Sequence, residues 1–396
     1  MARPHPSSLV RAGRRAAPAA LGVAALAAVS GTSPRAPAAP ASAPATAPTP
    51  ALTEVGFDSK RWTFVGGPAT RTVVEGDTTW TVPGFALLPD VDLADGLVEF
   101  DVRSTTFPAV VFHAHSPEEY ETVYLRMDRS GQPDALQYSP VFRRFLPWRL
   151  YPDGQAAAPL DTARPTHVRL EVRGRTARVT VDRAAAPQLV VALRHPAQGG
   201  AVGVWNSSGT QRFSHFRYAA LSGAPKAEAD FARTGPAAPG ALTAWGLSPL
   251  LIGATLDGYR APARDSARGW RPITADADGL VNVSRYYSAL ASEGHVTPVA
   301  ARTVLTRGRA GAARLAFGYC DRAAVFLNGQ RVFAGTLPLR RGGDFPRMLA
   351  RDTVPLPLRA GRNDLVVVTT GNTYGDRNGG WGFVARLVPG SEPGAP

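Results

Sequence analysis

Aromatic, amide and guanidinium side chains gather in one part of the chain, between residues 120 and 151. These groups suit sugar recognition, because flat rings pack against the C–H faces of pyranoses and planar donors bind adjacent hydroxyls. The segment also contains long polar stretches, and long ordered loops usually carry function. The candidate ligand-binding residues are Tyr124, Arg126, Gln137, Tyr138, Trp148 and Tyr151, joined by Trp205 and Asn206 from a neighbouring strand. For Trp148 and Tyr151 the alternative is that they cover an edge of the core.

Carboxylates offer a second candidate chemistry. Glu99 and Asp101 alternate on one expected strand, so they share a face with Cα atoms about 7 Å apart. Paired carboxylates perform glycoside hydrolysis, which makes these two the catalytic candidates if the protein is an enzyme. Asp276 and Asp278 look like part of a calcium loop that lacks its remaining oxygen ligands. They are the candidates for a structural calcium, and no other cofactor is expected.

Two histidines are also spaced to share a strand face. His113 and His115 are separated by one residue, but the acid that could complete a metal site, Glu121, has the opposite parity on its own strand. A polar sheet face is therefore favoured over a metal site.

The elements that must position these residues are strands. Apolar residues alternate in GLVEFDVRS (residues 96–104) and in HVRLEVRGRTARVTVD (residues 167–182), and the second of these runs is expected to form a hairpin through Gly174. No segment of useful length has helical periodicity. The sequence predicts an all-β protein with two β-sandwich, jelly-roll domains. Their boundaries are 51–220 and 242–396, with a linker at 221–241.

The first sandwich resembles a known family. The runs LADGLVEFDVRS, YETVYLRMDRSGQPDALQYSP and GAVGVWNSSGTQRFSHFRY are similar to concanavalin A-like, laminin-G-like domains of secreted bacterial proteins, including relatives of 3-keto-glycoside hydrolases. The resemblance implies a ligand on the concave face of one sheet. Laminarinase-type members carry Glu-x-Asp-x-x-Glu on a strand, whereas here Ser104 replaces the last carboxylate. That departure argues against the activity.

The second sandwich resembles another family. The Asp321–Gly329 stretch and the Leu358–Leu365 pattern are similar to galactose-binding-like jelly rolls, which accompany many glycoside hydrolases and often hold a structural calcium. Asn328-Gly329 predicts a tight hairpin turn, because both residues adopt positive φ readily. Asn328 is therefore expected to be a turn residue, and the resemblance implies an accessory or second binding module.

Composition and the first residues indicate export. Residues 1–30 combine four arginines with an apolar stretch at 16–29, as a signal peptide does, and a Pro/Ala-rich linker follows at 31–50. The mature chain would have no membrane span and would be periplasmic or extracellular. The net charge is +13, but no basic run carries interleaved aromatics, so nucleic-acid binding is disfavoured. The single Cys320 excludes an internal disulfide and is expected to be buried.

Three functions remain open at this point. The leading hypothesis is an exported carbohydrate-binding protein that holds a glycan or oligosaccharide on its N-terminal sandwich and works without chemistry. The second is a glycoside hydrolase acting on oligosaccharides. The third is a surface module that binds another protein, which would show an exposed apolar patch of several hundred Å².

Overall fold

The computed structural model describes residues 50–195, 199–208, 210–221, 238–260, 269–287, 297–337, 348–371 and 379–388. Within these ranges the chain from Pro50 onward belongs to one compact unit. The expected signal peptide at 1–30, nearly all of the linker at 31–50 and most of the linker at 221–241 lie outside the described residues. The predicted domain boundaries stay predictions. No described helix is long and apolar enough to cross a membrane.

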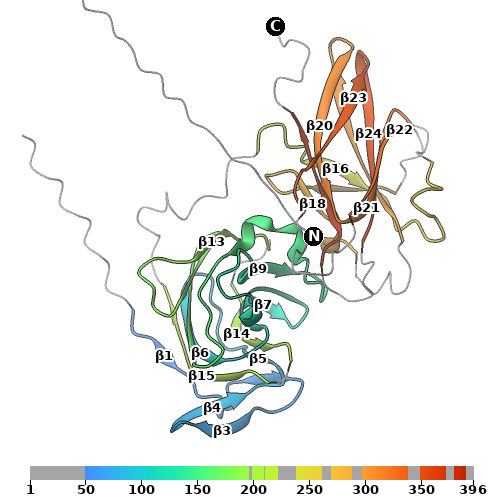
Figure 1. The fold of residues 1–396 in the computed structure, drawn as a ribbon. Helices are drawn as coiled ribbons and strands as arrows, with labels where there is room; N and C mark the ends of the chain where they lie inside the picture. The colour runs from blue at the N-terminus through green and yellow to red at the C-terminus, as the bar shows by residue number, and fades with distance from the viewer. Residues whose placement is uncertain are drawn as a thin grey trace, which may run out of the picture. The chain divides into compact units, whose positions relative to one another are not determined.

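The described chain is built almost entirely of antiparallel strands, which confirms the all-β prediction (Figure 1). One eight-stranded sheet has the order β13-β12-β11-β6-β15-β4-β3, with β1 paired to β15. Its strands are β1 (Thr53–Glu54), β3 (Thr70–Val74), β4 (Asp77–Thr81), β6 (Gly96–Arg103), β11 (Thr166–Arg173), β12 (Thr176–Val181), β13 (Leu189–Ala192) and β15 (Arg212–Ala220).

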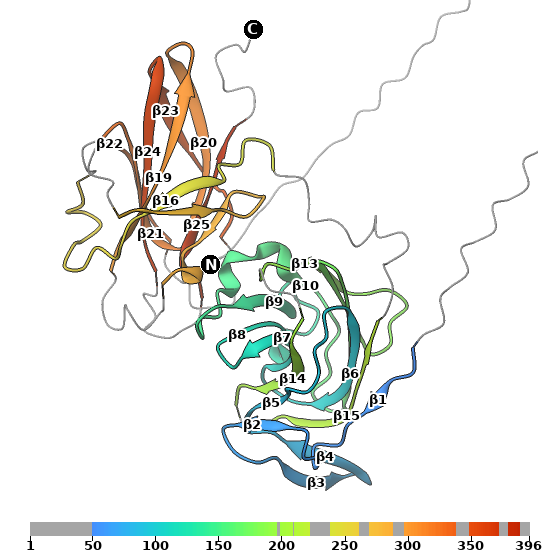
Figure 2. The ribbon, with the colours of Figure 1, turned by 180° about the vertical axis from the view of Figure 1, so that it is seen from behind.

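A seven-stranded sheet packs against the first, in the order β10-β9-β8-β7-β14-β5-β2 (Figure 2). Its strands are β2 (Thr63–Val65), β5 (Gly84–Leu88), β7 (Pro108–Ser116), β8 (Glu119–Leu125), β9 (Leu136–Val141), β10 (Gln155–Ala156) and β14 (Ala201–Asn206). Three single-turn 3-10 helices follow β8 and β9, namely η1 (Met127–Arg129), η2 (Trp148–Leu150) and η3 (Pro152–Gly154). The two sheets form the first sandwich.

Alternating apolar residues create the core of this sandwich. Val98, Phe100 and Val102 of β6 are fully buried in one cluster with residues of the seven-stranded sheet. Each such side chain contributes roughly 1.5–3 kcal/mol by leaving water. The expected hairpin is present, since β11 pairs with β12 and Gly174 takes a φ of 51° at the turn. These parity predictions are confirmed.

Two further sheets form the second sandwich around a separate core. The six-stranded sheet, in the order β17-β16-β19-β24-β21-β22, comprises β16 (Ala244–Leu247), β17 (Arg271–Thr274), β19 (Val299–Arg307), β21 (Asp321–Leu327), β22 (Gln330–Leu337) and β24 (Gly361–Thr370). The four-stranded sheet, in the order β18-β25-β20-β23, comprises β18 (Leu280–Asn282), β20 (Gly311–Tyr319), β23 (Asp352–Leu358) and β25 (Gly382–Leu387). The 3-10 helix η5 (Val283–Arg285) follows β18.

The predicted turn between β21 and β22 is confirmed. Asn328 and Gly329 take φ values of 51° and 86°. The Asn328 amide also donates to Asn363 Oδ1 at 3.0 Å, and the backbone N–H of Asp364 donates to Asn328 Oδ1 at 3.0 Å. Asn328 is therefore a structural turn residue that ties this hairpin to β24.

Residues 145–151 of the first sandwich reach into the second. Phe145 belongs to the core of the second sandwich, and Leu150 and Tyr151 pack with residues that include Leu280 and Cys320. The Arg149 guanidinium donates to Asp321 at 3.0 Å in a fully buried ion pair. This segment was expected to hold a ligand, and the structure shows that much of it joins the two sandwiches.

Cys320 is buried within the same contact, as expected. Burial raises the pKa of its thiol to about 12, and the thiolate is the form that reacts. We expect the native protein at pH 8 to leave a disulfide reagent such as Ellman's reagent unconsumed. The same protein in concentrated guanidinium chloride should consume one equivalent. Rapid reaction of the native protein would contradict this burial.

Candidate functional site

The outer face of the seven-stranded sheet carries a row of side chains across five adjacent strands. Phe85 of β5 lies opposite Trp205 of β14, which lies opposite Ala109 of β7. The row continues through Tyr124 of β8 to Gln137 of β9. Four strand spacings make this row roughly 19 Å long. We call this set of residues the aromatic row.

Aromatic rings dominate the exposed part of the row. Trp205 stacks on Phe85 with ring centroids 6.0 Å apart and an interplanar angle of 19°, and both side chains are only partly buried. Trp148 of η2 and Phe107 pack against the same cluster and are also partly buried. The guanidinium of Arg126 lies 5.8 Å from the Phe107 ring centroid. The face thus combines flat apolar rings with a cation at its border.

Polar groups at the end of the row are arranged for hydrogen bonding. The Tyr124 hydroxyl donates to Gln137 Oε1. Burial raises the pKa of Tyr124 above its usual value, so the phenol stays neutral. Among the described residues, Gln137 Nε2 is buried without a hydrogen-bond partner. Such a group in a folded protein calls for a partner, which a ligand can supply.

Three of the sequence-predicted ligand residues do not lie on this face, which corrects the prediction. Tyr138 pairs with Val123 and is buried in the core between the sheets. Asn206 follows Trp205 on the opposite side of β14, and its amide donates to the Gln211 carbonyl. Tyr151 is buried against the second sandwich, where its hydroxyl accepts from the Asn282 amide at 2.8 Å. Successive strand residues point to opposite faces of a sheet. Tyr138 therefore lies on the opposite face from Gln137, and Asn206 lies on the opposite face from Trp205.

Arg126 is on the predicted side but is buried in an ion pair with Asp134. The predicted residues that the structure brings together are therefore Tyr124, Arg126, Gln137, Trp148 and Trp205. The same cluster contains three residues that were not predicted from the sequence, namely Phe85, Phe107 and Tyr120. Phe85 lies in GFALL, where apolar residues on both parities conceal which side is outward.

A buried acid, Glu121, binds several polar groups on the core side of this sheet. The Glu121 carboxylate is fully buried on the core side of β8 and accepts from the Tyr138 hydroxyl at 2.6 Å and from the backbone N–H of His195 at 3.1 Å. His113 Nδ1 lies 2.9 Å from Glu121 Oε2. A β-bulge gives His113 a φ of 48° and turns it inward, whereas His115 is exposed. The two histidines therefore do not share a face.

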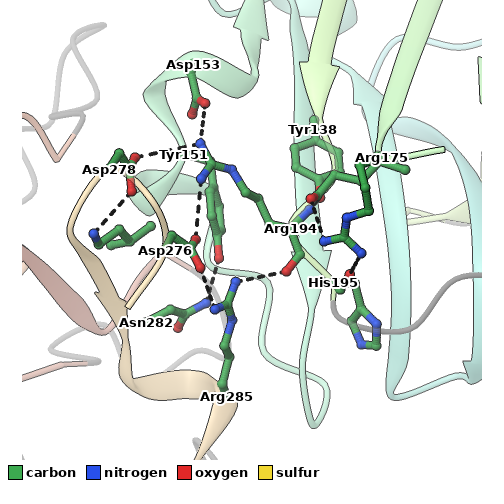
Figure 3. A network of polar contacts seen from close by, with 12 residues as sticks. Tyr138, Tyr151, Asp153, Arg175, Arg194, His195, Asp276, Asp278, Asn282 and Arg285 are labelled. Atoms are coloured by element: carbon green, nitrogen blue, oxygen red, sulfur yellow. Dashed lines mark hydrogen bonds and ion pairs between the residues drawn. The ribbon is translucent and has the colours of Figure 1, made fainter. Parts of the chain in front are cut away.

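Charged side chains surround a cleft near the contact between the sandwiches (Figure 3). Asp153 Oδ2 accepts from Arg194 at 2.6 Å, and Asp276 and Asp278 lie 3.6 and 3.7 Å from the same guanidinium. Burial disfavours the charge of Arg194, but these carboxylates hold its pKa above the usual value. Arg285 donates to Asp276 at 2.5 Å and to the Arg194 carbonyl at 2.9 Å.

The two carboxylates proposed for catalysis lie on the other sheet. Glu99 and Asp101 project from β6 on the outer face of the eight-stranded sheet, since the alternate residues of β6 fill the core. Glu99 contacts Arg169 and Arg217. Partial burial works against ionisation of Asp101, but the hydrogen bond and charge of His167, 2.6 Å away, lower its pKa. These acids share no cleft with the aromatic row.

Comparison with known proteins does not assign this chain to a family. No family model matches the sequence, and no curated protein matches it. Among solved structures, the carbohydrate-binding module CBM66 from Bacillus subtilis is 13% identical, with a TM-score of 0.30 over 40% of this chain and 95% of that one. The xylan beta-1,4-xylosidase from Bacillus halodurans C-125 is 15% identical, with a TM-score of 0.31 over 44% of this chain and 40% of the enzyme. Similarity this low assigns neither a ligand nor an activity.

The proposed calcium residues already have cationic neighbours. Asp276 contacts Arg285 and Arg194, and Asp278 contacts Arg194. Asp278 Oδ1 also accepts the backbone N–H of Leu280 at 3.2 Å. Within the described residues, no group of three or more His, Cys, Asp or Glu side chains is placed to hold a metal ion. The arrangement suits an ion-pair network, and calcium at this loop stays a prediction.

Proposed function

We propose that this protein binds a glycan on the aromatic row of its first sandwich and acts by binding alone. The observation that carries the proposal is the partly exposed Trp205–Phe85 stack in line with Tyr124 and Gln137. Stacked rings offer a flat apolar surface to the C–H face of a sugar. Tyr124 and Gln137 are buried at the far end of the row, so the surface open to a ligand is formed by Phe85 and Trp205 on adjacent strands, which suits one or two sugar units.

The same proposal assigns a role to each sandwich and a location to the protein. A laminin-G-like first sandwich would be the glycan-binding part, and a galactose-binding-like second sandwich would be its accessory module. The signal-like residues 1–30 support export to the periplasm or the extracellular space.

Two other functions find less support in the described residues. The acids Glu99 and Asp101 lie away from the aromatic row, and Glu118 and Asp134 are each paired with an arginine. Large exposed apolar side chains, such as Val73, Ile252 and Leu349, come from separate segments of the chain. A hydrolase would need two carboxyl groups in one cleft. A protein-docking module would need a contiguous exposed apolar patch.

Replacing Trp205 by alanine tests the proposal. The purified protein is screened on an array of neutral and acidic oligosaccharides, and the best ligand is titrated by calorimetry. We expect Trp205→Ala to weaken binding about tenfold or more, because the stacking surface is lost. Trp80→Ala is the matched control, since Trp80 is a partly buried tryptophan of the other sheet.

The outcomes are distinct. Equal affinity for the wild type and Trp205→Ala, or equal losses in Trp205→Ala and Trp80→Ala, would refute the aromatic row as the site. Release of shorter sugars during long incubation would refute binding without chemistry.

A further inference from the structure

The charged cleft is large enough to hold a small ligand. Its volume is about 930 Å³, and it lies between residues 190–195 of the first sandwich and the loop 276–278 of the second. This size is typical of small-molecule sites, which measure about 300–1,000 Å³. The aromatic row contributes no residue to its lining, so the cleft is a separate place on the molecule.

The charges around the cleft balance one another. Four arginines and four acids line it: Arg175, Arg194, Arg285, Arg386, Glu119, Asp153, Asp276 and Asp278. Arg175 donates to the carbonyl oxygens of Leu193 and His195, and Arg386 donates to that of Asp278. Neither a strongly anionic nor a strongly cationic ligand would therefore gain much from the lining as a whole.

Carboxylates are the polar groups that a ligand reaches most easily. The side chains of Asp153 and Asp278 are 51% and 33% exposed, whereas that of Arg194 is only 14% exposed. A carboxylate has about four lone-pair positions, and Arg194 and Leu280 occupy only part of that capacity. Because Arg194 binds both acids, it holds their acceptor oxygens close together and in fixed positions (Figure 3).

The cleft also has an apolar side. Tyr286 is partly exposed in the lining, with the Arg271 guanidinium 5.0 Å from its ring centroid. Val190 in the same lining is 49% exposed. A ring and an aliphatic side chain beside fixed acceptors can contact both the C–H surface and the hydroxyls of one ligand.

We propose that this cleft is a second binding site, which takes the terminal unit of a neutral, hydroxyl-rich ligand such as a saccharide. Adjacent hydroxyls donate to Asp153 and Asp278, and Arg194 keeps those carboxylates in place. Arg285 supports Arg194 by donating to its carbonyl oxygen and to Asp276. Tyr286 contacts the apolar edge of the ring. A neutral ligand fits because a hydroxyl can donate to a carboxylate without upsetting the balance of charge, whereas a sulfated or carboxylated unit would face two exposed acids.

Near-isosteric substitutions test this site separately from the aromatic row. Asp153→Asn and Asp278→Asn each replace one carboxylate acceptor by an amide, with little change of shape. The matched control is Asp90→Asn, because Asp90 is a similarly exposed acid paired with Arg61 at 2.7 Å, away from the cleft. Each variant is first checked for native circular dichroism and an unchanged melting temperature.

The probes are neutral oligosaccharides of two to five units and a sulfated, heparin-derived tetrasaccharide, titrated against the full protein and each variant. We expect at least one neutral oligosaccharide to bind Trp205→Ala with measurable affinity and to bind the double variant Trp205→Ala/Asp278→Asn about tenfold or more weakly. Asp153→Asn should act in the same direction, and Asp90→Asn should change nothing. The sulfated probe should bind no better than the neutral ones.

Failure of this site and failure of the aromatic row are distinguishable. If Asp153→Asn and Asp278→Asn bind every neutral probe as Asp90→Asn does, the cleft site is refuted, whatever Trp205→Ala shows. Preferential binding of the sulfated probe in a manner that depends on Asp278 would refute the neutral class of ligand. Unchanged binding in Trp205→Ala together with loss in Asp278→Asn would support the cleft and refute the aromatic row.

Discussion

Replacing Arg149 by methionine should lower the free energy of unfolding by about 3–5 kcal/mol. Asp321 would then lose the Arg149 guanidinium from a buried environment, since the two side chains are only 1% and 2% exposed and 3.0 Å apart. Removing one member of a buried ion pair leaves the charge of the other buried and uncompensated. The resulting loss of folding free energy exceeds the net contribution of the pair itself. Methionine preserves most of the volume of the arginine side chain, so the loss of stability comes mainly from removal of the guanidinium charge.

The measurement is equilibrium unfolding in urea, followed by fluorescence and by circular dichroism. Arg144→Met is the control, because Arg144 forms an ion pair with Glu118 at 3.6 Å in which both side chains are about half exposed. Pairs at such positions contribute about 0–1 kcal/mol. A loss in Arg149→Met no larger than that in Arg144→Met would show that the Arg149–Asp321 pair is not buried in solution.

Replacing Glu121 by leucine should be comparably damaging, with an expected loss of about 3–5 kcal/mol. The Glu121 carboxylate accepts from the Tyr138 hydroxyl and from the backbone N–H groups of Arg194 and His195, and it contacts His113. Leucine fills a similar space but accepts no hydrogen bond, so four polar groups lose their contact with Glu121, although the Arg194 N–H still donates to the Tyr138 hydroxyl at 2.6 Å. Each buried group left without a partner costs roughly 1–3 kcal/mol.

Two further variants make the result specific. Glu121→Gln retains one acceptor oxygen and should lose clearly less stability than Glu121→Leu. Glu171→Leu is the control, since Glu171 is a partly exposed acid of β11 beside Arg173, and it should change stability by less than about 1 kcal/mol. If glutamine and leucine at position 121 were equally tolerated, hydrogen bonding by Glu121 would not stabilise the core.

Much of the fold could be predicted from alternation alone. The core residues of β6, β11 and β12 follow from alternating valines with one phenylalanine, one leucine and one alanine, and the turn at Asn328-Gly329 follows from its two residues. The alternation of β8 is confirmed as well, since Val123 and Leu125 lie in the core and Tyr124 lies in the outer cluster. The failure is in β9, where every residue is buried. Tyr138 was grouped with the ligand residues because of its aromatic ring, but it packs in the core.

Local geometry and distant contacts account for the other differences. The bulge at His113 reverses the parity of β7, and no residue in PAVVFHAH marks it as a bulge. The role of Arg149 depends on Asp321, which lies 172 positions further along the chain. A single sequence does not connect such positions, so the segment 145–151 was interpreted from its composition and not from its contacts.

The insertion of Phe145 into the core of the second sandwich has a practical consequence for work with fragments. A piece ending near residue 221 would place Phe145, Leu150 and Tyr151 in water, together with an arginine deprived of its carboxylate. Adjacent apolar side chains exposed in this way promote self-association. Binding measurements on an isolated first sandwich would then contain a contribution from aggregation in addition to sugar binding. Coexpression of both sandwiches, or polar replacements at 145 and 150, would be needed before the first half could serve as a laboratory reagent.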